Sequence, residues 1–138
     1  MKVLFLDIDG VLNTHKSVGR YGIDFIDYIL LKLIRRIVNE TDCKIILSSS
    51  WRLDPKDRSI VDREFATEQL VIHDVTPYLS RLMRKDEINQ YLANNSVSKF
   101  AIIDDDSDAD VGHSFFHTDC NVGLTAKMAD AIIDHLKD

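Results

Sequence analysis

Short apolar runs alternate along this chain with segments whose apolar residues have helical spacing. The clearest runs are Lys2–Leu6, Lys44–Leu47 and Lys99–Ile103, and after its first lysine each is apolar at every position. A strand that is apolar at consecutive positions is buried on both faces, which is typical of parallel sheets covered by helices. The pattern therefore predicts an α/β fold with a central parallel sheet, helices on both faces and the first strand at its centre.

Weaker patterns predict the remaining elements. Thr14–Gly22 has neither a strand nor a helix pattern and contains two glycines. It predicts a weakly structured loop directly after the first strand, placed to act as a flap over a site. Helical spacing and further apolar stretches predict helices over Ile23–Asn39, Pro55–Gln69, Arg84–Ala93 and Thr125–Leu136, and strands over Leu70–Val75 and Ser114–His117.

Length and composition narrow the class of protein. A chain of 138 residues favours one domain over residues 1–138. A net charge of −6 disfavours indiscriminate binding to nucleic acid or anionic membranes, although it leaves room for a local basic pocket. Two cysteines without CxxC spacing form no disulfide framework, and the histidines lack zinc-site spacing. Because no targeting segment or membrane span is evident, we expect a cytoplasmic protein.

Polar residues follow three of the apolar runs at the point where each strand should end. These are Asp7-Ile8-Asp9-Gly10, Ser48-Ser49-Ser50 and Asp104-Asp105-Asp106. The carboxyl ends of parallel strands share one edge of a sheet, where ligands bind. Clustered carboxylates repel one another, and an all-oxygen set of ligands suits Mg²⁺. The sequence therefore predicts a magnesium site at this edge.

Simpler interpretations compete with an active site. Asp-x-Asp-Gly is a favourable turn sequence, and Asp104–Asp110 is compatible with a solvated acidic loop. A helix–loop–helix calcium site is disfavoured, since Ala109 stands where that loop needs Gly and Phe115 where it needs Glu. The joint placement of the acids and hydroxyls at one edge favours an active site. Trp51 allows two interpretations, a packed indole or a stacking surface for a nucleotide.

The same segments resemble the four motifs of the haloacid dehalogenase-like (HAD) superfamily of phosphohydrolases. Phe5–Asn13 resembles the first motif, an apolar strand followed by DxDG, and Ile45–Ser48 resembles the second, which ends in Ser or Thr. Arg84-Lys85 resembles the third, basic motif, and Ile102–Asp106 resembles the fourth, a strand ending in paired acids. The order matches over nearly the whole chain. Ser48–Arg52, together with the later strand end Ile103–Asp108, further resembles small HAD members associated with RNA-repair and phage proteins.

The resemblance implies a single Rossmann-like domain and Mg²⁺-dependent hydrolysis of phosphomonoesters through an aspartyl-phosphate. Asp7 would be the nucleophile, and Asp9 would serve as general acid and then general base. Ser48 would donate to a phosphoryl oxygen. Either Arg84 or Lys85 would neutralise the phosphate. The resemblance further implies that Asp104 positions this cation. It implies Asp7, Asp9 (through its carbonyl) and Asp105 as metal ligands, with Asp104 and Asp108 as alternatives for the third ligand. Gly10, Ser49 and Arg52 follow these strands beside the crevice and are candidate substrate-binding residues, with a surface arginine as the alternative interpretation of Arg52.

The chain leaves little room for a cap over the site. Thr14–Gly22 is short, and part of Leu53–Met83 must rejoin the sheet, whereas segments below about 40 residues seldom hold a core of their own. An open crevice suits a nucleotide or polynucleotide terminal phosphate, with a phosphoprotein as the alternative substrate. A phosphate-accepting receiver module and a non-catalytic binding domain are the rival classes, and the oligomeric state stays open. Basic residues available to contact a nucleic-acid end are Arg52, Arg58, Arg63, Arg81, Arg84 and Lys85.

Overall fold

One sheet of five parallel strands forms the centre of the computed structural model, which describes all residues from Met1 to Asp138. The strand order is β3-β2-β1-β4-β5, so β1 is central, as the sequence predicts. The strands are β1 (Lys2–Leu6), β2 (Lys44–Leu47), β3 (Ile72–Val75), β4 (Lys99–Asp104) and β5 (Phe115–His117).

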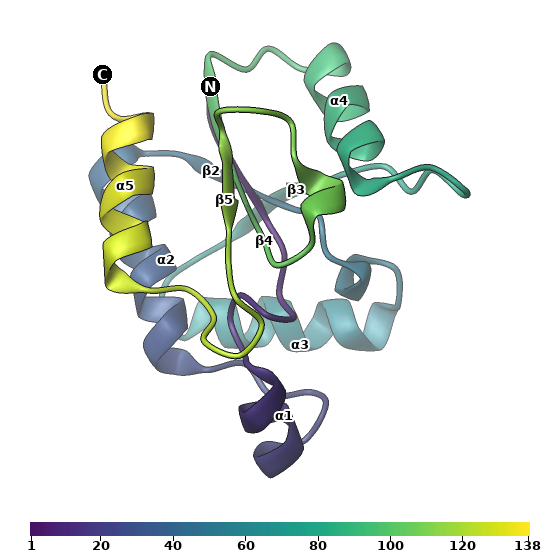
Figure 1. Cartoon of the computed structure of the whole chain (residues 1–138), viewed down its shortest axis with the longest axis vertical. Coiled ribbons are helices and arrows are strands. Elements are labelled where there is room, and N and C mark those ends of the chain that lie inside the picture. The colour runs from purple at the N-terminus through teal and green to yellow at the C-terminus, as the bar shows by residue number, and fades with distance from the viewer.

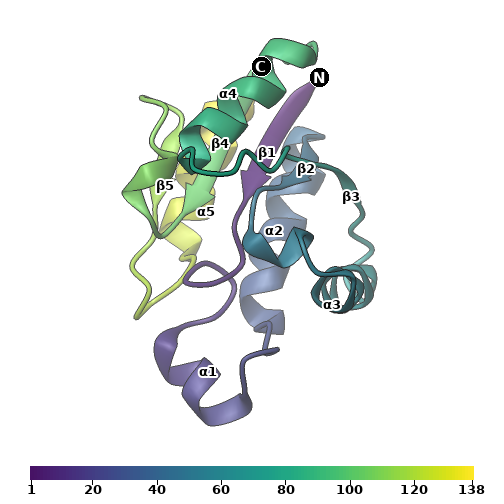
Figure 2. The same cartoon turned by 90° about the vertical axis from the view of Figure 1, so that its right-hand side faces the viewer.

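Helices cover both faces of this sheet, which confirms the predicted single Rossmann-like α/β domain (Figures 1 and 2). Three helices pack on one face and one helix on the other. The helix that follows β1 covers neither face and projects from the end of the molecule toward which β1 runs (Figure 2). The helices are α1 (His15–Tyr21, projecting), α2 (Tyr28–Thr41), α3 (Pro55–Ala66) and α5 (Ala126–Leu136) on one face, and α4 (Arg84–Asn94) on the other.

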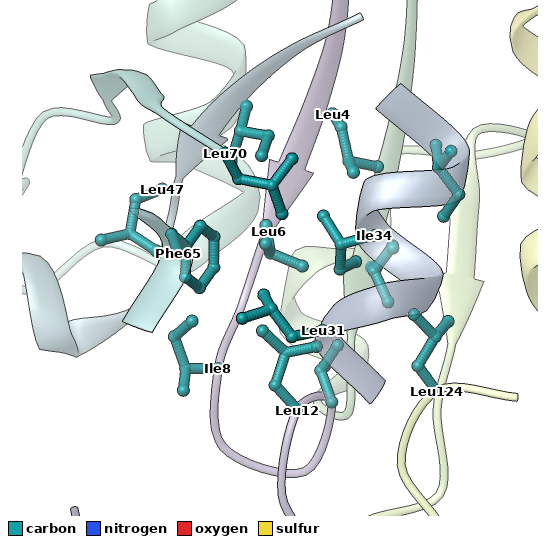
Figure 3. Close-up of a cluster of buried hydrophobic side chains, with 14 of the residues drawn as sticks. Leu4, Leu6, Ile8, Leu12, Leu31, Ile34, Leu47, Phe65, Leu70 and Leu124 are labelled. Atoms are coloured by element: carbon teal, nitrogen blue, oxygen red, sulfur yellow. The ribbon is translucent and has the colours of Figure 1, made fainter. Parts of the chain in front are cut away.

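Alternate side chains of each inner strand enter two separate hydrophobic clusters. In β1, Leu4 and Leu6 belong to the larger cluster with α2, α3 and α5, and Phe5 belongs to the smaller cluster beneath α4. Figure 3 shows Leu6 between Ile34 of α2 and Phe65 of α3. Because both faces of the inner strands are buried, their sequences are continuously apolar, and the edge that carries the acids is fixed by packing on both sides.

The segment that the sequence predicts as a loop over Thr14–Gly22 forms helix α1. Thr14 accepts a hydrogen bond from the Ser17 backbone N–H at 3.0 Å, and the Ser17 hydroxyl oxygen accepts one from the Thr14 N–H at 2.8 Å. This reciprocal capping box starts a helix that buries none of its residues. The loop prediction was wrong because a helix without a buried face has no apolar periodicity to detect.

The second helix begins later than the predicted Ile23. Asp27 caps α2 by accepting a hydrogen bond from the Ile29 N–H at 2.9 Å, so the helix starts at Tyr28. Ile23 itself is 79% exposed, outside the helix. Its apolar character therefore does not belong to the core stripe of α2.

Smaller differences from the sequence-based expectations concern element boundaries. The helix predicted to reach Gln69 ends at Ala66. β3 begins at Ile72 instead of Leu70, because the Leu70 N–H donates to the Phe65 carbonyl at the end of α3, at 3.0 Å. Both cysteines are free, in agreement with the predicted absence of a disulfide framework; Cys43 is buried and Cys120 is half-buried. None of the helices combines the length and apolarity that crossing a membrane would require.

Candidate active site

The register of the sheet brings the residues that follow β1, β2 and β4 next to one another. Leu6 pairs with Leu47 on one side and with Ile103 on the other. The Asp7 N–H donates to the Ile103 carbonyl at 3.1 Å, and the Ser48 N–H donates to the Leu6 carbonyl at 3.0 Å. Asp7, Ser48 and Asp104 therefore lie side by side at the carboxyl edge of the sheet.

Helix α4 supplies a cation to this edge. The Arg84 guanidinium Nη1 lies 3.3 Å from Asp7 Oδ1 and 2.7 Å from Asp104 Oδ2. Ile88, one turn further along α4, is fully buried in the smaller hydrophobic cluster and sets the rotation of the helix. Lys85, by contrast, is exposed. Of the two adjacent basic residues, the structure brings only Arg84 to the carboxylates.

Burial makes the negative charge at this edge unfavourable. Asp7 is 4% exposed, and its burial together with the nearby Asp104 carboxylate raises the pKa of Asp7 well above its ordinary value, although Arg84 opposes this shift. Burial and Asp104 also raise the pKa of Asp105. Burial opposes the charge on Arg84, but Asp7 and Asp104 raise its pKa overall. One guanidinium therefore faces more carboxylate charge than it can neutralise.

Three carboxylates at this edge lie close enough together to bind a divalent cation. One oxygen from each of Asp7, Asp104 and Asp105 lies within 4.8 Å of the others. Both oxygens of Asp104 accept hydrogen bonds, Oδ2 from Arg84 at 2.7 Å and Oδ1 from the Asp106 N–H at 3.0 Å. Asp7 and Asp105 are therefore the carboxylates whose oxygens are more available to an ion. Asp108 lies instead at the start of α4, where its Oδ2 is 3.5 Å from the Arg84 backbone nitrogen. An all-oxygen set of this kind suits Mg²⁺.

The turn after Asp9 depends on a glycine. Gly10 has a φ of +76°, and a Cβ at this position would lie 2.2 Å from Asp105 Oδ2. The Thr118 hydroxyl, which is buried, donates to the Gly10 carbonyl at 2.8 Å. The absence of a side chain at Gly10 thus lets the Asp105 carboxylate lie directly against the turn.

The two buried serines after β2 have different environments. The Ser48 hydroxyl is fully buried at the edge beside Asp7 and has no hydrogen-bond partner. The Ser49 hydroxyl accepts a hydrogen bond from the Trp51 N–H at 3.2 Å and caps the short helical turn Ser50–Arg52. An unpaired buried hydroxyl needs an explanation, and a ligand oxygen at this edge would supply the missing partner for Ser48.

Arg52 is not available in the way the sequence predicts. A guanidinium carries five N–H donors, and each one of Arg52 has an acceptor within the protein. Its side chain is 3% exposed. Arg52 therefore connects the end of β2 to the segment that precedes α4. No N–H of its guanidinium is left to bind a substrate phosphate. The acceptors are the carbonyls of Thr76, Ser48, Ser49 and Pro77 and the Glu87 carboxylate.

Trp51 and Asn13 make hydrogen bonds to Asp9 that are not among the contacts predicted from the sequence. The indole Nε1 of Trp51 donates to Asp9 Oδ2 at 3.0 Å, and the Asn13 side-chain nitrogen donates to Asp9 Oδ1 at 3.0 Å. Asn13 lies within the first motif and its spacing from Asp9 could have suggested a contact. Trp51 is 42 residues from Asp9, so only the fold joins them.

A cavity of about 480 Å³ separates the turn after β1 from helix α1. Its volume falls within the usual range of about 300–1,000 Å³ for small-molecule sites. The carboxylate side of the cavity is polar, and the opposite wall is provided by α1 and by Ile23, two residues after the end of that helix. The lining residues are Asp9, Gly10, Asn13, His15, Val18, Gly19, Ile23 and Asp105.

Comparison with known protein families gives one match that spans almost the entire chain. The family described as the HAD domain in Swiss Army Knife RNA repair proteins matches residues 3–129. No curated protein and no solved structure matches the chain significantly. The match includes the ends of β1, β2 and β4 and the start of α4, which together build the site.

Proposed function

The chain belongs to the family of HAD domains in Swiss Army Knife RNA repair proteins, and from this premise we propose that it is a Mg²⁺-dependent phosphomonoester hydrolase. The observation that carries the proposal is the Asp7 carboxylate, which is buried at the sheet edge within 3.3 Å of the Arg84 guanidinium. A carboxylate on a rigid strand end beside a fixed cation is suited to in-line attack on a phosphate whose charge that cation shares.

Asp7 and Asp9 divide the chemistry between them. An Asp7 carboxylate oxygen forms a bond to phosphorus while the bond to the leaving oxygen breaks, and Asp9 gives its proton to that oxygen. Water then attacks the phosphorus of the aspartyl-phosphate, and Asp9 takes the water proton. The second bond cleavage releases inorganic phosphate and restores the Asp7 carboxylate.

The remaining residues hold the phosphoryl group. Ser48 directs its unpaired hydroxyl to a phosphoryl oxygen, and Arg84 neutralises part of the charge while Asp104 keeps its guanidinium in place. Mg²⁺, when held by the carboxylates of Asp7 and Asp105 and the carbonyl of Asp9, would neutralise further charge on the phosphate. Removal of divalent ions with a chelator should abolish turnover, and added Mg²⁺ should restore it.

The best-supported substrate is a nucleotide or a polynucleotide terminal phosphate. The family is described by its occurrence in RNA repair proteins, and this description favours a nucleic-acid substrate over a sugar phosphate or a phosphopeptide. The cavity beside Asp9 gives the leaving group a place between the turn and α1. A panel of mononucleotides, oligonucleotides phosphorylated at either end, sugar phosphates and phosphopeptides tests this assignment. Preferential release of phosphate from sugar phosphates or phosphopeptides would contradict it.

The Asp9→Asn variant tests the aspartyl-phosphate mechanism with p-nitrophenyl phosphate. An aryl leaving group barely needs a proton, so the first step should survive in part, whereas hydrolysis of the adduct should be slow. We expect a burst of nitrophenol near one equivalent, followed by accumulation of phosphorylated Asp7 that mass spectrometry detects after rapid acid quenching. Unchanged turnover with neither burst nor adduct would exclude Asp9 as the acid–base group.

A further inference from the structure

Both carboxylate oxygens of Asp9 accept a hydrogen bond from a buried side chain. Trp51 Nε1 donates to Oδ2 and Asn13 Nδ2 donates to Oδ1, each at 3.0 Å. Asp9 itself is exposed and follows the end of β1, where an aspartate without such contacts would sample several rotamers. Its carboxylate is therefore held in one orientation by groups from two different parts of the chain.

The two donors are fixed by contacts of their own. Trp51 is 6% exposed within the larger hydrophobic cluster. Asn13 is 2% exposed, and both polar atoms of its carboxamide are hydrogen-bonded within the protein, because the oxygen accepts from the Gly10 N–H and the nitrogen also donates to the Phe25 carbonyl. Neither donor can turn toward solvent without breaking packing or a buried hydrogen bond. The orientation of Asp9 is thus determined by the core.

We propose that Trp51 and Asn13 are positioning residues that fix the Asp9 carboxyl for proton transfer to the leaving oxygen. The inference rests on the proposed function. A proton transfer needs heavy atoms within about 2.6–3.2 Å, so a carboxyl that rotates freely spends little time in reach. Each carboxylate oxygen has a second lone pair. The hydrogen bonds from Trp51 and Asn13 therefore leave Asp9 able to bind the leaving oxygen or the attacking water.

The Trp51→Phe variant separates positioning from general stability. It removes the donor and keeps an aromatic ring in the core. The value of kcat/KM reports the steps up to formation of the aspartyl-phosphate. The decrease in kcat/KM should therefore be larger for a leaving group that depends more on receiving a proton. We expect kcat/KM to fall about tenfold or more for an alkyl phosphate and by less than about threefold for p-nitrophenyl phosphate.

Phe65→Leu serves as the matched control, since Phe65 is fully buried in the same cluster and has no hydrogen-bond donor to offer Asp9. Its effect should be equal for the two esters. Combining Trp51→Phe with Asp9→Asn should add no further loss on the alkyl phosphate, because the indole acts through Asp9. An equal loss on both esters, or an additive double variant, overturns the inference while the hydrolase function stands. A wild-type protein inert toward every ester overturns both.

A measurement independent of turnover tests the contact itself. Trp51 is the single tryptophan, so the indole N–H gives one resonance in a heteronuclear NMR spectrum. Asp9→Ala should shift this resonance and speed its exchange with solvent, whereas Asp24→Ala should leave it unchanged. If Trp51→Phe fails to fold, replacement of Trp51 by 3-benzothienylalanine keeps the ring shape without the N–H donor, and the same difference between esters is expected. An indole resonance insensitive to Asp9→Ala would overturn the proposed contact.

Discussion

The carboxyl edge of the sheet and helix α1 border the same cavity but are stabilised in opposite ways. At the sheet edge, Asp7, Ser48, Asp104 and Arg84 come from four elements, and the fold buries Asp7, Ser48 and Asp104. Helix α1 buries none of its residues and depends on the local capping box at Thr14. The difference indicates that close packing fixes the side chains to which we assign the reaction. Helix α1, on the opposite side of the cavity, is a local structure that should accept substitutions without loss of the fold. Substitutions should therefore have large, general effects at the edge and small, selective effects at α1.

The largest expected effect is at Asp7. Asp7→Asn removes the carboxylate that we propose as the nucleophile, and we expect kcat to fall at least about 10⁴-fold for every phosphate ester. Asp24→Asn makes the same chemical change in the exposed segment after α1 and should leave kcat unchanged. Steady-state assays on aryl and alkyl phosphates measure both. Turnover of Asp7→Asn near the wild-type rate would contradict the expectation that substitutions at the sheet edge have larger effects than substitutions near α1.

Next in size is the difference between two neighbouring residues of α4. Arg84→Ala should lower kcat/KM by about 10²–10³-fold, since it removes the fixed cation that we propose neutralises the phosphoryl group. Lys85→Ala should change it by less than about threefold, because an exposed lysine outside the site contributes little. A larger decrease in kcat/KM for Lys85→Ala than for Arg84→Ala would contradict the assignment of Arg84 as the residue of α4 that faces the sheet edge.

The sequence was sufficient for the features that depend on local pattern. Continuous apolar runs indicated a parallel sheet, and the acids after two of those runs indicated its edge, because parallel strands end on the same side. The environment of Arg52 was not predictable in this way. Its acceptors are backbone carbonyls that only the fold brings together, so a basic residue beside the site appeared available for substrate.

Contacts between distant segments were equally inaccessible. Thr118 reaches the Gly10 carbonyl across 108 residues, and no local spacing indicates such a pair. Helix α1 was missed for a different reason. A helix of seven residues is too short to be stable from propensity alone, and it has no buried stripe. Its capping residues, Thr14 and Ser17, were the only local signal.

A smaller and selective effect is expected from Gly19→Leu in α1. Gly19 lines the cavity, and nothing lies within 4 Å of the position its Cβ would occupy. Leu also favours a helix more than Gly by roughly 0.5–1 kcal/mol, so the variant should fold. The added side chain should lower kcat/KM about tenfold for a nucleotide and much less for p-nitrophenyl phosphate, because the larger leaving group needs more of the cavity.

Lys16→Leu is the control for that variant, since it adds a similar side chain on α1 at a residue that does not line the cavity. It should leave the ratio of the two substrates unchanged. Equal losses for both substrates in Gly19→Leu would mean that α1 influences the site as a whole and does not specifically contact the leaving group.

The smallest expected effect is on stability, and it distinguishes the two regions without any substrate. Burial and Asp104 raise the folded-state pKa of Asp7, so the folded protein binds this proton more tightly than the unfolded chain does. The contribution of Asp7 to the free energy of unfolding therefore falls as pH rises from its unfolded pKa to its folded pKa. Without divalent ions, the destabilisation grows over this pH range and is complete once the pH exceeds the folded-state pKa.

Asp7→Asn removes the ionisable carboxyl, and it should raise the free energy of unfolding at neutral pH by roughly 0.5–2 kcal/mol, within the range of typical stabilising substitutions. At pH below the unfolded pKa of Asp7 the gain should vanish. Asp24→Asn should change the free energy little at either pH. Urea titrations in chelator at both pH values measure this, and added Mg²⁺ should stabilise the wild type more than Asp7→Asn. A loss of stability in Asp7→Asn at neutral pH would show instead that the ion pair with Arg84 outweighs the burial of charge.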